Sequence, residues 1–336
     1  MKPLDYYRQK YCNSQEAIGA ELSDLDSRQR ERPWRAKKML CEALADIYEK
    51  INPAKAARLR ECGRVLSFRV YADGSKKLDS MTSCHVRLCP LCNWRRSLKM
   101  WSNIRSIIDY VQADKENQYI LLTLTVKNCR SFELNDVIDN LMSAWNRFVG
   151  YTEIKKAVKG WYRCLEITHN VNRQSKDFDT YHPHFHCLLC VNPSYFTSRD
   201  YISVEKMSYL WAKAGRLDYV PVIDMRKVKP DSTGSISGAL AEVCKYTVKS
   251  VDYFVMDDAL LTIDSVRTLD YALANRRLVA YGGVLKSARQ ILKLEDDVDG
   301  NLVNVDNLSG TDDNGDYYIE TYYWYAGYRQ YVSIET

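Results

Sequence analysis

Long apolar runs, a nucleotide-binding loop and an even cysteine count are all missing from this sequence. No stretch of 18 or more apolar residues occurs, so we expect no membrane-spanning helix. The N-terminal segment has no apolar core, so we expect no secretion signal. The pattern GxxxxGK[ST], which cradles nucleotide phosphates, is absent, and this excludes a nucleotide-driven motor built on that loop.

Cysteine usage indicates the redox compartment. The 11 cysteines are an odd number in a chain of 336 residues. An odd number in a mid-sized chain argues against a disulfide scaffold and favours reduced thiols together with a metal site. The sequence therefore predicts a cytoplasmic protein without a membrane partner. An apolar content of 46% is enough for the cores of two or three structural units.

Charge is spread unevenly along the chain. Residues 1–113 carry 22 Lys and Arg against 13 Asp and Glu, whereas residues 290–336 carry 2 against 10. A basic N-terminal third suits a polyanionic partner such as nucleic acid. An ordinary solvated surface explains the same imbalance equally well.

Apolar periodicity predicts a mixture of helices and strands, and hence an α+β fold. Helices are expected at 16–61, 94–112, 133–149, 203–213 and 238–250. Strands are expected at 63–72, 119–126, 162–170, 184–191 and 219–228. The acidic stretch 295–316 is predicted to be a linker, and the tyrosine-rich residues 317–334 a hairpin.

Three of the five histidines lie within residues 182–186. Because alternate residues of a strand share a face, His184 and His186 are expected side by side, whereas Pro183 makes the position of His182 less certain. Antiparallel pairing with the strand at 162–170 would add Glu166. Two imidazoles and a carboxylate suit Mg²⁺ or Mn²⁺ acting on phosphate oxygens. The alternative is surface histidines or histidines satisfied within a core.

The predicted helix at 238–250 carries a second set of polar residues. Glu242, Tyr246 and Lys249 stand at i, i+4 and i+7, which places them on one helix face. Such residues are also common on solvated faces. A tyrosine hydroxyl, with a pKa near 10, needs a nearby cation or a polarised phosphate before it can attack. Lys249 can steady a phosphate, and Glu242 can accept a proton.

Three motifs occur in a recognisable order: LLTLT (121–125), HPHFHCLL (182–189) and EVCKYTVK (242–249). With them the chain resembles the replication initiators of small rolling-circle bacterial plasmids, in the single-tyrosine branch of the HUH endonuclease superfamily. The resemblance covers about residues 60–290. It includes CPLCNWRR (89–96) and NPSYFTSRDYIS (192–203). It implies an antiparallel-sheet HUH endonuclease core with helices on the sheet.

The resemblance also implies roles for these residues. Tyr246 matches the nucleophile that joins to a 5′-phosphate and releases a 3′-hydroxyl primer. His184 and His186 match the metal ligands, and Lys249 matches the lysine of the motif. Glu242 matches the glutamate that activates water at the terminating step, where other branches use a second tyrosine. Glu166 as third metal ligand rests on strand pairing and on analogy with related nucleases.

The expected partner is the double-strand origin of a plasmid, read as duplex and nicked where it is single-stranded. Because no helicase motif is present, strand separation is assigned to a host helicase. A homodimer is a candidate assembly, since origins are often repeated or inverted.

A cysteine cluster precedes the resembling motifs. Cys89 and Cys92 form a C-x₂-C half-site for structural Zn²⁺, with Cys84 close by. Cys62 is the first choice for the fourth ligand and His85 the second, since adjacent residues rarely reach one ion. The alternative is a set of reduced thiols in a core.

The basic helix after this cluster is predicted to contact DNA. Arg95, Arg96 and Lys99 are expected to bind phosphates, which gives affinity and register but no base readout. The chain is thus divided into a helical segment, a zinc-binding basic element, a HUH catalytic domain and an acidic linker with the hairpin: 1–60, 61–113, 114–290 and 291–336.

Three other interpretations compete with the plasmid initiator. A conjugative relaxase or a single-strand transposase would share the chemistry, but the length and the zinc element favour a plasmid initiator. A zinc-containing DNA-binding regulator without catalysis would leave the histidine pair and the Glu–Tyr–Lys face unexplained. A zinc deaminase needs the triplet H-x-E, which the sequence lacks.

Overall fold

The computed structural model describes residues 19–26, 28–232, 235–244, 248–255, 257–298, 300–303, 305 and 315–333. The chain forms two compact units, Met1–Arg95 with Asn301–Thr336, and Arg96–Gly300. The first unit thus combines both ends of the chain, whereas the sequence predicts four consecutive segments. Each unit is described separately.

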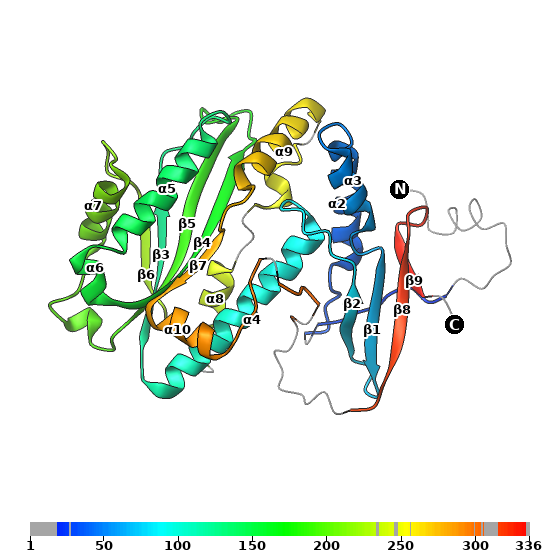
Figure 1. The fold of residues 1–336 in the computed structure, drawn as a ribbon, viewed down its shortest axis with the longest axis horizontal. Helices are drawn as coiled ribbons and strands as arrows, with labels where there is room; N and C mark the ends of the chain where they lie inside the picture. Colours follow the sequence, from blue (N-terminus) through cyan, green and yellow to red (C-terminus); the bar gives the residue numbers. More distant parts are fainter. Residues whose placement is uncertain are drawn as a thin grey trace. The chain divides into compact units, whose positions relative to one another are not determined.

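The first unit is a four-stranded antiparallel sheet with two helices (Figure 1). Its sheet order is β2-β1-β8-β9. The predicted hairpin at 317–334 is confirmed, and its first strand pairs with β1 along the whole length of β1. The elements are α2 (Trp34–Tyr48), α3 (Pro53–Glu61), β1 (Val65–Tyr71), β2 (Lys76–Met81), β8 (Tyr317–Tyr325) and β9 (Gln330–Ser333).

The helix predicted to start at residue 16 is wrong for the described residues before Trp34. These residues form isolated bridges at Glu21 and Leu25 instead of a helix. Asp26 accepts hydrogen bonds from the backbone N–H groups of Arg28 and Arg30, so a side-chain-capped turn competes with helix formation. The first described helix begins directly after Pro33, which favours a helix start.

The second unit contains a five-stranded antiparallel sheet in the order β6-β3-β5-β4-β7. Its strands are β3 (Gln118–Thr125), β4 (Val158–Asn170), β5 (Thr180–Val191), β6 (Ile223–Lys227) and β7 (Val279–Gly282). Its helices are α5 (Leu134–Phe148), α6 (Thr152–Ala157), α7 (Val204–Gly215), α8 (Ser237–Val243), α9 (Ala259–Leu273), α10 (Gly283–Ile291), η1 (Tyr195–Thr197) and η2 (Ser250–Asp252). The helix α4 (Pro90–Asp114) contains the boundary between the two units. This α+β architecture confirms the predicted fold class.

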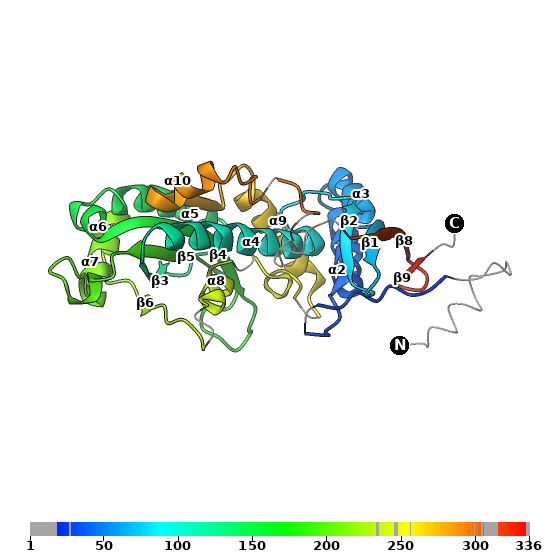
Figure 2. The same cartoon turned by 90° about the horizontal axis from the view of Figure 1, so that it is seen from below.

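Helices cover both faces of the five-stranded sheet. Figures 1 and 2 show α4, α8 and α10 on one side, where their apolar residues form one core cluster with β3, β4 and β5. On the other side α5 and α7 pack through aromatic edges. Trp145 contacts Phe185 with ring centroids 5.8 Å apart, and Phe148 contacts Trp211 at 5.7 Å.

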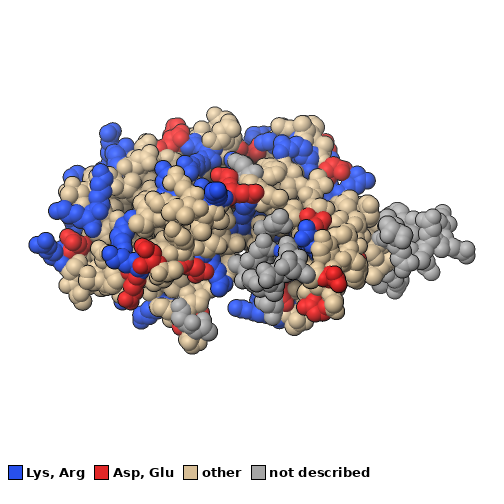
Figure 3. All heavy atoms as spheres, turned by 60° about the horizontal axis from the view of Figure 1, so that its bottom comes forward, with Lys and Arg blue, Asp and Glu red and all other residues tan. Residues whose placement is uncertain are grey.

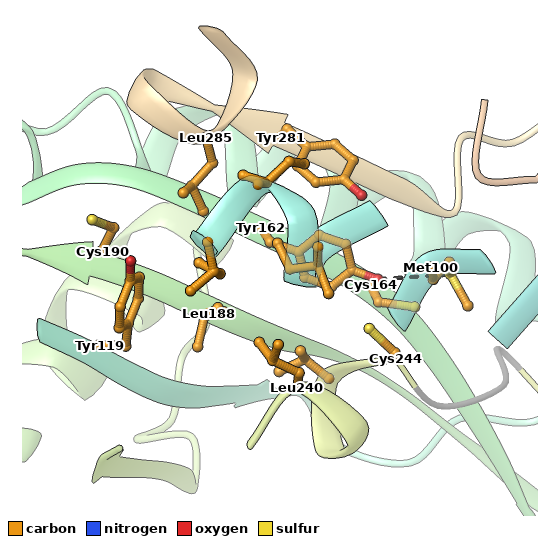
Figure 4. Close-up of a cluster of buried hydrophobic side chains, with 14 of the residues drawn as sticks. Met100, Tyr119, Tyr162, Cys164, Leu188, Cys190, Leu240, Cys244, Tyr281 and Leu285 are labelled. Carbon is orange, nitrogen blue, oxygen red and sulfur yellow. Dashed lines mark hydrogen bonds between the residues drawn. The ribbon is translucent and has the colours of Figure 1, made fainter. Parts of the chain in front are cut away.

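Figure 4 shows the core cluster on the α4 side of the sheet. Tyr162 lies at its centre and donates a hydrogen bond to the sulfur of Met100. Cys164, two residues further along β4, is the cross-strand partner of His186. Because the side chains of a strand alternate between the two faces of the sheet, the face that carries the apolar cluster also carries the histidine pair.

The predicted helix at 238–250 is shorter than expected. In the structure α8 ends at Val243, and Lys249 has extended backbone angles. The backbone N–H of Lys249 donates to the carboxylate of Asp252. Lys249 thereby caps the start of the separate turn η2. Lys249 thus lies outside the helix, so the expected i, i+7 relation to Glu242 is wrong.

The predicted DNA contacts at the start of α4 are contradicted by burial. Arg95 is fully buried and donates to the backbone carbonyls of Leu302 and Val303, within the first unit. In the second unit Arg96 donates to a backbone carbonyl and Lys99 pairs with a carboxylate, and both are about 5% exposed. These cations hold the chain segment around residue 300, so they are not available to phosphates.

Surface charge comes from other residues. Figure 3 shows Lys and Arg side chains in several groups on one face of the molecule, with Asp and Glu among them. Among the described residues, no helix is both long and apolar enough to cross a lipid bilayer.

Replacing Arg95 tests whether it is structural. Its guanidinium also lies over the rings of Trp34 and Trp94, at 5.3 and 5.4 Å. We expect Arg95→Met to lower the free energy of unfolding by about 1–3 kcal/mol, because buried carbonyl groups lose their donors. Urea denaturation measures this, with the half-exposed Arg105→Met on the same helix as control. An unchanged unfolding free energy with weakened DNA binding would restore the predicted phosphate contact.

Candidate metal centre

Strand pairing brings Glu166 to the histidine pair. β4 and β5 pair antiparallel, as predicted, and Glu166 stands directly opposite His184. The Glu166 carboxylate lies 2.6 Å from Nε2 of His186 and 3.5 Å from Nε2 of His184. One ligand atom from each residue lies within 4.8 Å of the others. The three groups therefore converge on one point, as a metal centre requires.

A buried carboxylate needs compensation, and here three donors supply it. Glu166 is only 3% exposed. Burial alone would raise the pKa of its carboxyl group, but hydrogen bonds from His184, His186 and Lys249 hold that pKa well below its usual range. Glu166 is therefore an anion in the folded protein, which is the form that binds a cation.

Lys249 reaches the same carboxylate from another element. Its ammonium nitrogen lies 2.8 Å from the second carboxylate oxygen of Glu166. The hydrogen bond to Glu166 raises the pKa of Lys249. The side chain is 43% exposed, so one end of this ion pair faces solvent. The turn at residues 249–252, and not a helix face, brings the lysine to the site.

Oxygen atoms behind the rings orient both histidines. Nδ1 of His186 lies 3.3 Å from the hydroxyl of Thr123, and Nδ1 of His184 lies 3.0 Å from the carbonyl oxygen of His182. Such contacts fix a ring's direction and leave Nε2 for a ligand. Both Nε2 atoms therefore point towards Glu166, and the donor set of two nitrogens and one carboxylate could hold a metal ion.

The strand β5 already includes His182, despite Pro183. The ring of His182 stacks on that of His184 with centroids 5.0 Å apart. Burial, followed by the neighbouring His184, lowers the pKa of His182. His182 is not part of the three-residue group that converges on one point.

Of the third motif, the structure describes the glutamate but not the tyrosine. Glu242 lies half-buried in the last turn of α8, and its charge contributes to raising the pKa of Lys249. Tyr246, the predicted nucleophile, lies outside the described residues. Its role therefore stays a prediction.

The four predicted cysteines of the first unit come together. Sγ–Sγ distances are 3.6 Å from Cys62 to Cys89, 3.5 Å from Cys62 to Cys92 and 3.7 Å from Cys84 to Cys92. Four sulfurs at about 2.3 Å from a tetrahedral Zn²⁺ would stand roughly 3.8 Å apart. The thiols therefore fit a structural zinc site, with Cys62 and not His85 as the fourth member.

Two neighbours of this thiol cluster were not anticipated. Gly63 has φ +59, and a Cβ there would lie 2.3 Å from a methyl carbon of Leu91, so only glycine fits after Cys62. The sulfur of Cys41 lies 3.5 Å from the sulfur of Cys89. Burial raises the pKa of Cys41 well above its ordinary value, so this thiol stays protonated beside the cluster.

Comparison with known proteins places the chain in a family. Residues 75–332 match the family model described as a replication protein. Protein rep of Bacillus amyloliquefaciens is 36% identical over 93% of this chain and 96% of its own length. Protein rep of Lactiplantibacillus plantarum is 40% identical over 82% of this chain and 86% of its own.

A third relative, protein rep of Streptococcus pneumoniae, is 35% identical over 84% of this chain and 86% of its own length. No solved structure matches the chain significantly. The family match covers the histidine strand, the thiols at 84–92 and the C-terminal hairpin alike. The chain therefore belongs to the replication-protein family, as its resemblance to the initiators of rolling-circle plasmids predicted.

Proposed function

We propose that this protein initiates rolling-circle replication of a plasmid by nicking one strand of the origin with Tyr246. The observation that carries the proposal is the convergence of His184, His186 and Lys249 on the buried Glu166. A cation site beside a solvent-facing lysine is suited to a phosphodiester, whose charge must be neutralised while it reacts. The family membership supports the same substrate.

The nicking step exchanges one phosphate ester for another. The Tyr246 oxygen bonds to phosphorus, and the bond from phosphorus to the 3′-oxygen breaks. The proton lost by the tyrosine balances the proton gained by the leaving 3′-oxygen, which becomes the primer hydroxyl. No energy source is needed, because the phosphotyrosine preserves the ester for later rejoining.

The other residues bind and orient the phosphate. Lys249 pairs with a non-bridging oxygen, and Glu166, His184 and His186 would hold Mg²⁺ or Mn²⁺. When bound, the ion supplies Lewis-acid polarisation of the phosphate. At termination Glu242 accepts the proton of a water molecule that attacks the scissile phosphate of the regenerated origin and releases its 3′-hydroxyl. That 3′-hydroxyl then displaces the Tyr246 oxygen from the 5′-phosphate, which rejoins the strand and restores the tyrosine. This use of water assigns the protein to the single-tyrosine branch.

The first unit has a structural task in this proposal. Cys62, Cys84, Cys89 and Cys92 would hold Zn²⁺, which fixes the start of α4 against β1 and β2. We propose that origin DNA is recognised as duplex and cut where it is single-stranded, and that a host helicase opens it. A homodimer bound to a repeated or inverted origin remains part of the proposal.

Nicking of a labelled single-stranded oligonucleotide with the plasmid's own origin tests the proposal. In Mn²⁺ or Mg²⁺ we expect a covalent protein–DNA adduct, seen on a denaturing gel and by protein mass. Tyr246→Phe should abolish the adduct, because no hydroxyl remains. Glu242→Ala should accumulate it, because water is no longer activated. Tight origin binding without any cleavage by the wild type would leave a zinc-bearing DNA-binding regulator.

Zinc content tests the thiol cluster. We expect about one zinc ion per purified chain by elemental analysis, and its loss in Cys62→Ser, because three thiolates do not close a structural site. Thermal unfolding should then shift to lower temperature. The matched control is Cys41→Ser, which changes a buried thiol of the same cluster but should keep the ion. Equal zinc content in wild type and Cys62→Ser would exclude the site.

A further inference from the structure

A buried polar cluster without an assigned role lies at the end of β4. His169 is 5% exposed, and its ring stacks on Tyr181 with centroids 4.2 Å apart. Its Nε2 lies 3.0 Å from a carboxylate oxygen of Asp179, and its Nδ1 lies 3.0 Å from the carbonyl oxygen of Asp252. One histidine thus joins two chain segments that are 73 residues apart.

The second of these segments is the turn that carries Lys249. The backbone N–H of Asp252 donates to the carbonyl of Lys249 at 2.9 Å, and the Asp252 carboxylate accepts from the N–H of Lys249 at 2.9 Å. The backbone N–H of Phe254 likewise donates to the carbonyl of Ser250. These hydrogen bonds make the turn rigid. A contact that holds Asp252 therefore also fixes the position of Lys249.

The alternation of side chains along β4 shows how this strand holds the turn at residues 249–252. Glu166 and His169 are three residues apart in a strand, so their side chains point to opposite faces of the sheet. Lys249 pairs with Glu166 on one face, while the carbonyl of Asp252 meets His169 on the other. The turn therefore straddles β4 and is attached to it from both sides.

His169 is itself held by its surroundings. Asp179 has φ +55, and its N–H donates to the carbonyl of Asn170, which closes the loop between β4 and β5. On the other side the hydroxyl of Ser265, in α9, lies 3.3 Å from Nδ1 of His169. Ser265 donates its own proton to the carbonyl of Leu261, so it accepts at the ring. The ring is thus restrained by the β4–β5 loop, by η2 and by α9.

We propose that His169, oriented by Asp179, is a positioning residue for the nicking reaction. It fixes the turn at residues 249–252, and with it the ammonium group of Lys249 at the metal centre. It also anchors the chain three residues after Tyr246. This inference rests on the proposed function, since the reaction it serves is the tyrosine transfer described above.

The alternative is a histidine that only stabilises the core. A stabilising residue would change the free energy of unfolding but would leave amide exchange in the turn and the reaction rate of the folded protein unaltered. A positioning residue acts on the turn first, and small displacements of a reacting group cost about 10- to 100-fold in rate. The two roles therefore differ in what they change.

The experiment compares three variants of the full chain with the wild type. His169→Ala removes both ring contacts. His169→Asn keeps an amide N–H near the position of Nδ1 and so retains a donor to Asp252. The matched control is Ser208→Ala in α7, a buried hydroxyl that donates to the carbonyl of Pro221 elsewhere in the same unit.

Two measurements are made on each variant. Hydrogen exchange, followed by mass spectrometry, reports the amides of residues 249 and 252–254 without requiring activity. Single-turnover adduct formation at saturating origin oligonucleotide gives the rate constant, and the dissociation constant is measured separately. Tyr246→Phe defines the background.

We expect His169→Ala to speed exchange in the turn at least tenfold and to slow adduct formation about 10- to 100-fold at unchanged DNA affinity. His169→Asn should recover part of both, and Ser208→Ala should alter neither. Unchanged exchange in both His169 variants, or faster exchange with a wild-type rate constant, would overturn the inference. If the wild type forms no Tyr246-dependent adduct, the proposed function fails, and the exchange result alone decides whether His169 anchors the turn.

Discussion

One buried negative charge organises the second unit. An ionised carboxylate away from water costs several kcal/mol unless it is compensated, and Glu166 is buried on one face of the sheet. Two histidines of the neighbouring strand and Lys249 of a separate turn provide the compensation. The same arrangement attracts a divalent cation, because the carboxylate and the two imidazole nitrogens then become its ligands. The stability requirement and the chemistry of the site therefore coincide.

Strand alternation distributes the functions over β4. On the face that carries Tyr162 and Cys164, apolar packing against α4 leads directly to Glu166. On the opposite face Leu165 and Ile167 lie in the core, and His169 ends the row as the anchor of the turn. A single strand thus supplies the core of both layers, the proposed ligand and the proposed positioning residue.

Much of the site was predictable from sequence because short-range patterns determine it. The period of two in β5 and the antiparallel pairing place Glu166 with His184, and the cysteine spacing brings Cys62 to the thiol cluster. Long-range interactions were not predictable. The position of Lys249 depends on its ion pair with the distant Glu166, and the burial of Arg95 depends on carbonyls more than 200 residues away. The elements between residues 259 and 291 also went unpredicted, because they depend on distant contacts: α9 packs on α5, β7 pairs with β4, and α10 packs on β4 and β7.

Binding of Mn²⁺ in the absence of DNA tests the central claim most directly. Isothermal titration of the wild type, of Glu166→Gln and of Lys249→Gln would separate the ligand from its partner. The account predicts that Glu166→Gln weakens binding at least tenfold, because the anionic ligand is lost. It predicts that Lys249→Gln retains or strengthens binding, because a competing cation is removed. Equal affinity in the wild type and Glu166→Gln would contradict the account and would leave the buried carboxylate as a structural ion pair.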